Sequence, residues 1–246
     1  MSFNEYAERR DFLRRAATAP PEVKRRWLRD LQRNRRDDQQ LKLMLTFFLT
    51  EKSNCIDVGA YRGKFIADMI RLAPRGHHIA FEPVPHLSEH LKLRCPQVDV
   101  RNVALGDVDG EESFVVVPEA LAYSGFCEQD YPFEVSKQPI RVNVARLDSC
   151  LPEEYVPNFI KIDVEGAEIR VLRGGVKTIS KYRPVIAFEH GRAAARYDYG
   201  PESLYELIVG QVGMRIFDMD GDGPYDLAAF RASCESDDRW NYIAHD

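Results

Sequence analysis

The feature that most constrains the fold is a regular alternation of short apolar runs with helical patterns, which begins at residue 53. The runs predict strands at 55–58, 78–81, 98–103, 112–117, 140–144, 158–164, 185–188, 215–217 and 241–244. Helical patterns lie between several of them, at 65–72, 85–93, 202–209 and in a segment that passes through Leu172 and ends at Gly174-Gly175. Such alternation predicts an α/β fold with a parallel sheet covered on both faces. Ligands of these sheets bind at the carboxyl ends of the strands.

Residues 1–50 have a different character and predict a helical extension in front of this domain. They contain no Gly and are rich in Arg, Leu, Ala, Glu and Gln, which favour helices. Pro20-Pro21 interrupts the pattern, Pro21 suits the first turn of a second helix, and Asp37 or Asp38 could cap a third. A length of 246 residues fits one domain with an appendage. We therefore divide the chain into an extension over 1–50 and a domain over 51–246.

The charge of the chain is distributed unevenly between these two parts. The formal net charge of −5 combines +5 over residues 1–50 with −10 over 51–246. The arginines of segment 9–36 could contact nucleic-acid phosphates. Against nucleic acid stand the interleaved acids and the acidic domain. The preferred interpretation is a solvated helical face, or pairing with the acidic domain or with a second copy of the chain. A homo-oligomer formed through these helices therefore stays an open alternative.

Cysteine usage and hydropathy indicate the cellular setting that we expect. The five cysteines form no CxxC pair and fit neither a zinc site nor a disulfide framework. The first residues carry charges instead of the apolar core of a signal peptide. The apolar stretch 41–49 is interrupted by Lys42 and is too short to span a bilayer. We expect a soluble, cytoplasmic protein with free thiols and no membrane span.

The loop after the first predicted strand is the first candidate ligand site. It contains Asp57, Gly59 and Gly63 in the pattern D-x-G-x-x-x-G. Glycines there let the backbone turn sharply and a ligand approach its amides, although tight turns also use Gly for steric reasons alone. The pattern lacks GxGxxG and the Walker sequence, and a carboxylate would repel a diphosphate. A ligand with a cationic head and no phosphate, such as S-adenosylmethionine, suits Asp57 better.

Glu82 ends the second predicted strand and is the second candidate ligand residue. It lies nineteen residues beyond Gly63, and an acid at about this distance commonly accepts hydrogen bonds from both ribose hydroxyls. A single Glu at a strand end is often merely solvated. Combined with the glycine loop and its leading Asp57, it predicts a nucleoside site.

Several motifs then carry a family resemblance, in order from about residue 54 to residue 190. They are CIDVGAYRG, FEP, NVALGDVDG, RLDSCL, FIKIDVEGAEIRVLRGG and RPVIAFEH. Together they resemble the FkbM family of class I S-adenosylmethionine-dependent methyltransferases, with KIDVEGAE followed by LRGG as the most specific part. Two segments depart from the family pattern, namely Ala60-Tyr61-Arg62 in the glycine loop and 122–125, which is only loosely like the serine-rich stretch of the family.

The resemblance implies a fold, an activity and a set of cofactor residues. The fold would be Rossmann-like, with seven strands that are parallel except for one late strand. The activity would be O-methylation of a hydroxyl on a sugar, glycan or secondary metabolite. S-adenosylmethionine would be the cofactor, and its implied contacts are Asp57, Gly59, Ala60, Tyr61 and Gly63 at the methionine end, Glu82 and Pro83 at the ribose, and Asn102 and Ala104 near the adenine.

The acceptor hydroxyl must lose a proton, so a base is expected beside it. Acidic residues and one histidine follow the later strands at the same edge of the sheet, namely Asp163, Glu165, Glu168, Glu189 and His190. Our hypothesis is that Asp163 or His190 accepts the proton and that Glu189 orients it or the substrate. Glu165 and Glu168 could instead be acids that the positive N-terminus of the following helix stabilises, and His190 could have a purely structural role.

Four further possibilities stay open from the sequence. Asp163, Glu189 and His190 would suit Mg²⁺ or Mn²⁺, but no spacing demands a metal and none is expected. The stretch 118–138 could close over the acceptor with Tyr123, Phe126, Tyr131 and Phe133, or be a surface loop. A nucleic-acid methyltransferase would instead carry [DN]PP[YFW] where this chain has KIDVEG, and a non-enzymatic nucleoside-binding protein could share the fold.

Overall fold

The computed structural model describes residues 20–129, 131, 134–197, 199–236 and 238–246. Its main sheet has seven strands in the order β3-β2-β1-β7-β8-β10-β9. Their bounds are Val98–Arg101 for β3, His78–Phe81 for β2, Cys55–Val58 for β1, Phe159–Ile162 for β7, Val185–Glu189 for β8, Asn241–His245 for β10 and Arg215–Asp218 for β9. Only β10 runs antiparallel to its neighbours in this sheet. The Rossmann-like fold with one late antiparallel strand is therefore confirmed.

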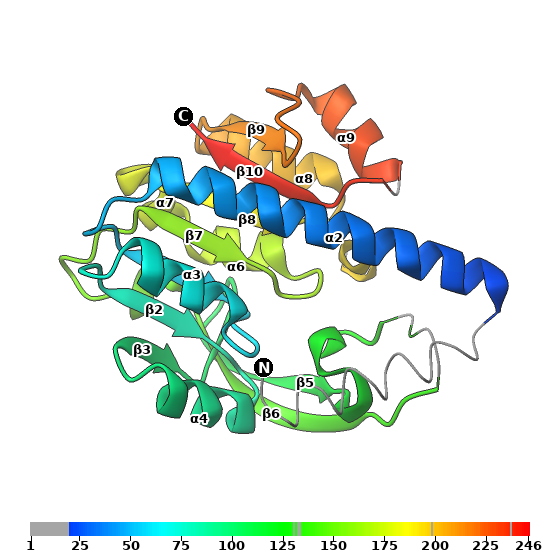
Figure 1. Ribbon diagram of the computed structural model, residues 1–246, viewed down its shortest axis with the longest axis horizontal. Helices are drawn as coiled ribbons and strands as arrows, with labels where there is room; N and C mark the ends of the chain where they lie inside the picture. Colours follow the sequence, from blue (N-terminus) through cyan, green and yellow to red (C-terminus); the bar gives the residue numbers. More distant parts are fainter. Residues whose placement is uncertain (1–19, 130, 132–133, 198, 237) are drawn as a thin grey trace.

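Helices cover both faces of the main sheet (Figure 1). One face carries α2 (Pro21–Phe48), α3 (Lys64–Leu72) and α4 (Pro85–Arg94). The other carries α6 (Glu168–Gly174), α7 (Val176–Tyr182), α8 (Pro201–Tyr205) with its π-helical continuation η3 (Glu206–Gln211), and α9 (Leu227–Glu235). The central strands are buried on both faces, as expected for a covered parallel sheet.

A separate three-stranded sheet lies beside the main one and was not expected from the sequence. Its order is β4-β6-β5, with β4 at Ala104–Leu105, β5 at Gly110–Val116 and β6 at Gln138–Ala145. The 3-10 helix η1 (Pro118–Tyr123) follows β5, and Gly125 then forms an isolated bridge with Val115. The chain between β5 and β6 is thereby folded back towards the carboxyl edge of the main sheet.

The prediction of a third helix beginning at Asp37 or Asp38 is wrong. One helix, α2, runs without a break from Pro21 to Phe48. Asp37 is 2% exposed and lies within it, where its carboxylate pairs with Arg33 (2.8 Å) and accepts a hydrogen bond from Asn241 (2.9 Å). These partners satisfy Asp37 inside the helix, so it has no need of the free backbone amides that a cap provides. The start at Pro21 is confirmed, and the helix expected before it lies outside the described residues.

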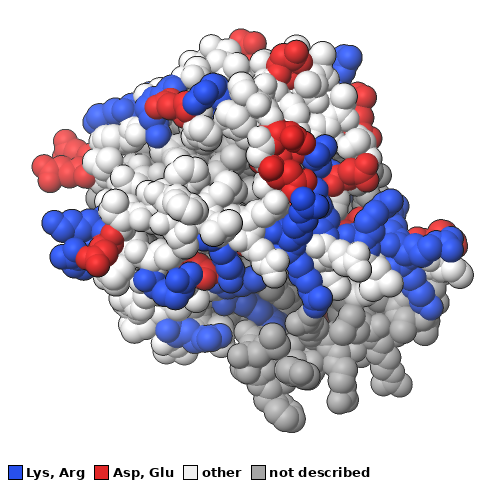
Figure 2. All heavy atoms as spheres, turned by 45° about the horizontal axis from the view of Figure 1, so that its top comes forward, with Lys and Arg blue, Asp and Glu red and all other residues white. Residues whose placement is uncertain are grey.

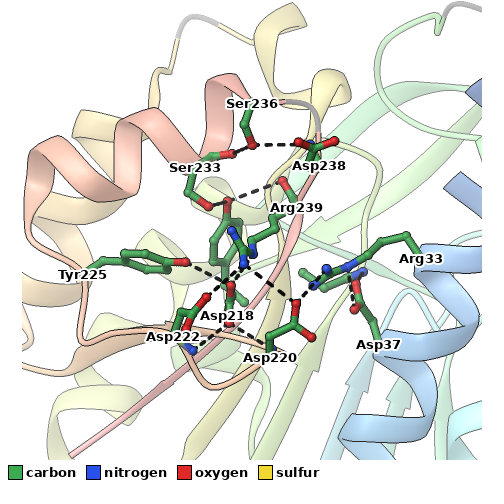
Figure 3. A network of polar contacts seen from close by, with 12 residues as sticks. Arg33, Asp37, Asp218, Asp220, Asp222, Tyr225, Ser233, Ser236, Asp238 and Arg239 are labelled. Carbon is green, nitrogen blue, oxygen red and sulfur yellow. Dashed lines mark hydrogen bonds and ion pairs between the residues drawn. The ribbon is translucent and has the colours of Figure 1, made fainter. Parts of the chain in front are cut away.

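Helix α2 is fixed to the sheet by apolar packing at one end and by ion pairs along its middle. Leu41 and Leu45 are buried against Phe65 of α3 and Phe159 of β7. Asp220, just beyond β9, pairs with Arg33 of α2 at 2.9 Å (Figure 3). The side chains of Arg36, at 2.8 Å, and Gln40, at 2.9 Å, bind the same carboxylate. On the face shown in Figure 2, acidic and basic side chains accordingly border one another. Part of the positive charge of the extension is thus neutralised by the acidic domain, as the preferred interpretation expected.

Other differences from the sequence expectations are additions and shifts of boundaries. Helices α5 (Leu147–Cys150), α7 and α9 and the 3-10 helix η2 (Arg192–Arg196) were not predicted.

No described helix is long and apolar enough to cross a membrane. The five cysteines are free thiols, as expected. Phe133, one of the aromatic residues predicted to close over an acceptor, lies outside the described residues.

Candidate active site

The loop that follows β1 is pressed against the end of β7. Gly59 has a φ of +77°, and a Cβ built there would lie 1.9 Å from the carbonyl oxygen of Asp163. The backbone N–H of Gly59 and that of Ala60 both donate to the carbonyl oxygen of Phe81, at 3.0 and 3.1 Å. Only glycine fits this position, because both the left-handed backbone and the missing side chain are needed.

Glu82 is held in place by the same loop. Its carboxylate accepts hydrogen bonds from the backbone N–H of Tyr61 (2.7 Å) and of Val84 (2.9 Å), one on each oxygen. Glu82 is 4% exposed, and burial raises its pKa to about 7 although both hydrogen bonds oppose the shift. The Asn102 amide supports the strand end by donating to the carbonyl oxygens of Glu82 and Pro83. Each carboxylate oxygen keeps a lone pair for a further donor.

A first cavity lies between this loop, the end of β2 and the small sheet. Of the predicted cofactor residues, five line it, namely Gly59, Tyr61, Glu82, Pro83 and Ala104. Phe114, Leu121 and Phe126 add an apolar side to it. The other four predicted residues do not line the cavity: Asp57, Ala60, Gly63 and Asn102. Ala60 is buried in the loop, and Gly63 is the N-cap of α3 with a φ of +75°. Asn102 donates a hydrogen bond to the carbonyl oxygen of Glu82 just beyond β2.

Asp57 lies beneath the cavity and is paired with a lysine that sequence reasoning missed. Lys161 stands opposite Asp57 in the register of β1 and β7. Its Nζ lies 3.9 Å from Asp57 Oδ1 and 2.8 Å from Asp163 Oδ2. Burial raises the pKa of Asp57 to about 6, and neither of its carboxylate oxygens accepts a hydrogen bond from the described residues. The signal in the sequence was a charged residue at the centre of the apolar strand Phe159–Ile162.

The Lys161 ammonium controls the charge of Asp163. Burial alone would raise the pKa of Asp163, but the nearby Lys161 holds it below its ordinary value. Burial alone would lower the pKa of Lys161, but Asp163 and Asp57 raise it instead. The Asp163 carboxylate is therefore ionised at neutral pH, and an ammonium ion holds it in position.

Two further carboxyl groups near Asp163 behave in the opposite way. Burial, reinforced by the negative charge of Asp163, raises the pKa values of Glu165 and Glu189 well above normal. Glu189 also shares a hydrogen bond with Asp163, which a protonated Glu189 donates to the carboxylate. Glu165 has a φ of +58°, a strained conformation for a residue with a side chain. Environments that drive neighbouring carboxyl groups to different charge states are typical of acid–base sites.

A second cavity meets the first at these carboxyl groups. Asp163, Glu165 and Ala122 line both cavities, whereas Glu189 lines only the second. Five residues of α2 form part of the wall of the second cavity, namely Val23, Arg26, Trp27, Asp30 and Asn34. Sequence analysis assigned no residue of the extension to this site.

The structure places Glu168 and His190 away from both cavities. The Glu168 carboxylate accepts hydrogen bonds from the backbone N–H of Val164 (3.0 Å) and Gly166 (3.2 Å), so it shapes its own loop. The His190 ring packs on Phe230 of α9 with 6.1 Å between ring centroids, on the opposite face of the sheet from α2. His190 is 7% exposed, and burial lowers its pKa to about 4. Within the part of the chain that the structure describes, no group of three or more His, Cys, Asp or Glu side chains is arranged to hold a metal ion.

Comparison with known proteins agrees with this architecture. The chain is 26% identical over 176 residues to the 2-O-methyltransferase NoeI of Sinorhizobium fredii, a match that covers 65% of this chain and 67% of NoeI. It is 26% identical over 223 residues to the AMB antimetabolite synthetase AmbE of Pseudomonas aeruginosa, which covers 72% of this chain and only 10% of AmbE. Methyltransferase FkbM from Methylobacillus flagellatus has a similar fold, with a TM-score of 0.50, 17% identity and coverage of 80% of this chain and 44% of that chain.

A family pattern gives the assignment. The Methyltransferase FkbM domain matches residues 57–209, which is more than half of the chain. The matched segment begins at Asp57 and takes in the glycine loop, Glu82, Lys161 and the acids that follow β7 and β8. This chain belongs to the FkbM methyltransferase family.

Proposed function

We propose that this chain is an S-adenosylmethionine-dependent O-methyltransferase that acts on a hydroxyl group of a sugar or secondary metabolite. The observation that carries the proposal is the junction of the two cavities at Asp163 and Glu165. One cavity has the features of a nucleoside site, and the other opens beside a carboxylate that Lys161 keeps ionised. A methyl donor and a hydroxyl acceptor could therefore meet at a base.

The residues around the first cavity fit S-adenosylmethionine. Glu82 can accept hydrogen bonds from the two ribose hydroxyls, since each of its oxygens uses only one backbone donor. Asp57 does not line the cavity, and Lys161 lies 3.9 Å from its carboxylate, so its part in the site is to pair with Lys161 rather than to contact the ligand. When bound, S-adenosylmethionine supplies an electrophilic methyl group attached to sulfur.

The residues around the junction supply the proton chemistry. The Asp163 carboxylate would take up the proton that the acceptor hydroxyl loses, as the methyl carbon exchanges its bond to sulfur for a bond to that oxygen. Lys161 keeps Asp163 ionised, at 2.8 Å, and protonated Glu189 orients the carboxylate through their hydrogen bond. Since Asp163 accepts protons well only while it is ionised, the lowered pKa is suited to this role.

The relatives support oxygen as the methyl acceptor. NoeI is named as a 2-O-methyltransferase, and the match to it covers 65% of this chain. The half-buried acids at the junction agree with that chemistry, because a hydroxyl oxygen must give up its proton during transfer and the methyl donor carries no base. The Arg33 and Arg36 side chains, which the nucleic-acid alternative would use for phosphate contacts, are paired with Asp220.

Replacing Glu82 with Gln should weaken S-adenosylmethionine binding about tenfold or more, because hydrogen bonds to a charged acceptor are worth about 1.5–3 kcal/mol each. Gln also presents one N–H₂ group where Glu82 accepts from the backbone. Isothermal titration calorimetry measures the effect. Glu89→Gln, on the exposed side of α4, is the matched control and should bind normally. Equal dissociation constants for the two variants would show that Glu82 does not hold the ribose.

Replacing Asp163 with Asn should lower kcat about 100-fold or more while the dissociation constant of S-adenosylmethionine changes less than about threefold, since Asn cannot accept the proton. Transfer of labelled methyl groups to small hydroxylated compounds gives kcat, and calorimetry gives binding. Asp99→Asn, an exposed residue of β3, serves as the control. Normal turnover by the Asp163 variant would exclude this residue as the base.

Replacing His190 with Phe should leave methyl transfer largely intact and reduce the loss of stability in acid. The neutral ring is buried with a pKa of about 4, whereas an unfolded His has a pKa of about 6.5. Between these values the unfolded state binds more protons, so this contribution to stability is lost as pH falls from about 6.5 to about 4. Denaturant unfolding at about pH 7.5 and about pH 5 should show the wild type losing about 2 kcal/mol more than the variant. A 100-fold fall in kcat would instead place His190 in the chemistry.

A further inference from the structure

The second cavity is bounded by two parts of the chain that are far apart in sequence. Its floor comes from Asp163, Glu165 and Glu189 at the carboxyl edge of the sheet. Its opposite wall comes from α2, where Val23, Trp27, Asp30 and Asn34 are spaced by three or four residues and so share one face of the helix. That face lies outside the segment matched by the family, which begins at residue 57. The α2 wall therefore lies outside the part of the chain on which the family assignment rests.

Both tryptophans of the protein line this cavity. The sequence contains two, Trp27 in α2 and Trp240 before β10. The indole N–H of Trp240 donates to Asn34 Oδ1 at 2.7 Å, which joins β10 to the same face of α2. Each indole offers a large, rigid apolar surface at a small entropic cost. The apolar C–H face of a sugar ring is a suitable partner for such a surface, and its hydroxyls are left for polar neighbours.

The charged residues of the cavity suit a neutral acceptor better than an ionic one. Among the lining residues that the structure describes, three arginines stand against four acids, namely Arg26, Arg196 and Arg239 against Asp30, Asp163, Glu165 and Glu189. Two of these acids, Glu165 and Glu189, have pKa values raised well above normal, which reduces the negative charge. Neither positive nor negative charge predominates in the cavity, so it has no strong field to attract a polyanion. Carboxyl and guanidinium groups together provide acceptors and donors for hydroxyl groups.

The wall is fixed in position by a polar network (Figure 3). Arg33 and Gln40 bind Asp220 from α2, while Arg239, next to Trp240, pairs with Asp218 and lies 2.9 Å from Asp222. Asp218 is 1% exposed and also accepts a hydrogen bond from the Tyr225 hydroxyl at 3.0 Å. The network therefore holds α2 and the segment that carries Trp240 in one arrangement, and a wall held in this way can select an acceptor by shape.

We propose that the α2 face carrying Trp27, together with Trp240, is the acceptor-recognition wall and that it selects a neutral sugar ring. The proposal rests on the proposed methyl transfer and narrows its acceptor class. The hydroxyl to be methylated would point towards Asp163, with the ring held between the wall and Glu189.

The test uses the full-length protein with a set of methyl hexopyranosides as probes. Adding them should change the intrinsic tryptophan fluorescence saturably, and the wild type should transfer labelled methyl groups to at least one of them. For that glycoside, Trp27→Ala should raise KM about tenfold or more, while the dissociation constant of S-adenosylmethionine stays within about twofold. Trp27→Phe should recover most of the affinity, because it restores an aromatic surface. Leu28→Ala is the matched control, since Leu28 is 51% exposed on a different side of the same turn.

Three results would overturn the inference. One is the absence of both binding and methylation for every glycoside in the set. Another is a Trp27→Ala variant whose KM equals that of the Leu28→Ala control. The third is methyl transfer to catechol or to an RNA oligonucleotide in preference to the glycosides. Failure of the proposed function itself would look different, because S-adenosylmethionine would then not bind or no acceptor of any class would gain a methyl group.

Discussion

The ion pairs that the Lys161 ammonium makes with Asp57 and Asp163 determine how the site is arranged. They join neighbouring strands, since Asp57 belongs to β1 and Asp163 follows β7. Without a cation between them, these two carboxylates would repel each other and take up protons. Lys161 keeps the pKa of Asp163 below its ordinary value, whereas burial and the charge of Asp163 raise the pKa values of Glu165 and Glu189. The Lys161 ammonium therefore separates the charge state of Asp163 from that of its neighbouring carboxyl groups.

The close approach of backbones makes this arrangement possible. Gly59 lets the β1 loop lie against the carbonyl group of Asp163, and the loop in turn presents the Tyr61 amide to Glu82. The residues that face the first cavity and those that face the second are thus parts of one rigid assembly. A change in the β1 loop would alter the position of Asp163, because the Asp163 N–H donates to the carbonyl oxygen of Val58 at the end of β1.

Much of the fold and the first cavity could be predicted from the sequence, because they depend on local patterns. Apolar runs bounded by turns marked the strands, and the glycine loop and Glu82 marked residues that line the first cavity. The second cavity could not be predicted, because its wall depends on the long-range pairing of Arg33 with Asp220. Asp37 was wrongly predicted to cap a helix for the same reason, because its partner Asn241 is distant in sequence. His190 follows β8 as expected, but its ring turns to α9, and a strand pattern alone does not say which face a residue after the strand will take.

We propose that a methyl group passes to an oxygen atom at the junction of the two cavities. Mass spectrometry and nuclear magnetic resonance of the acceptor, after incubation with S-adenosylmethionine that carries a labelled methyl group, test this directly. We expect a labelled methyl ether on one hydroxyl of the acceptor, with one S-adenosylhomocysteine formed for each methyl transferred. Label on nitrogen or carbon, or bound S-adenosylmethionine that is never consumed with any hydroxylated acceptor, would contradict it.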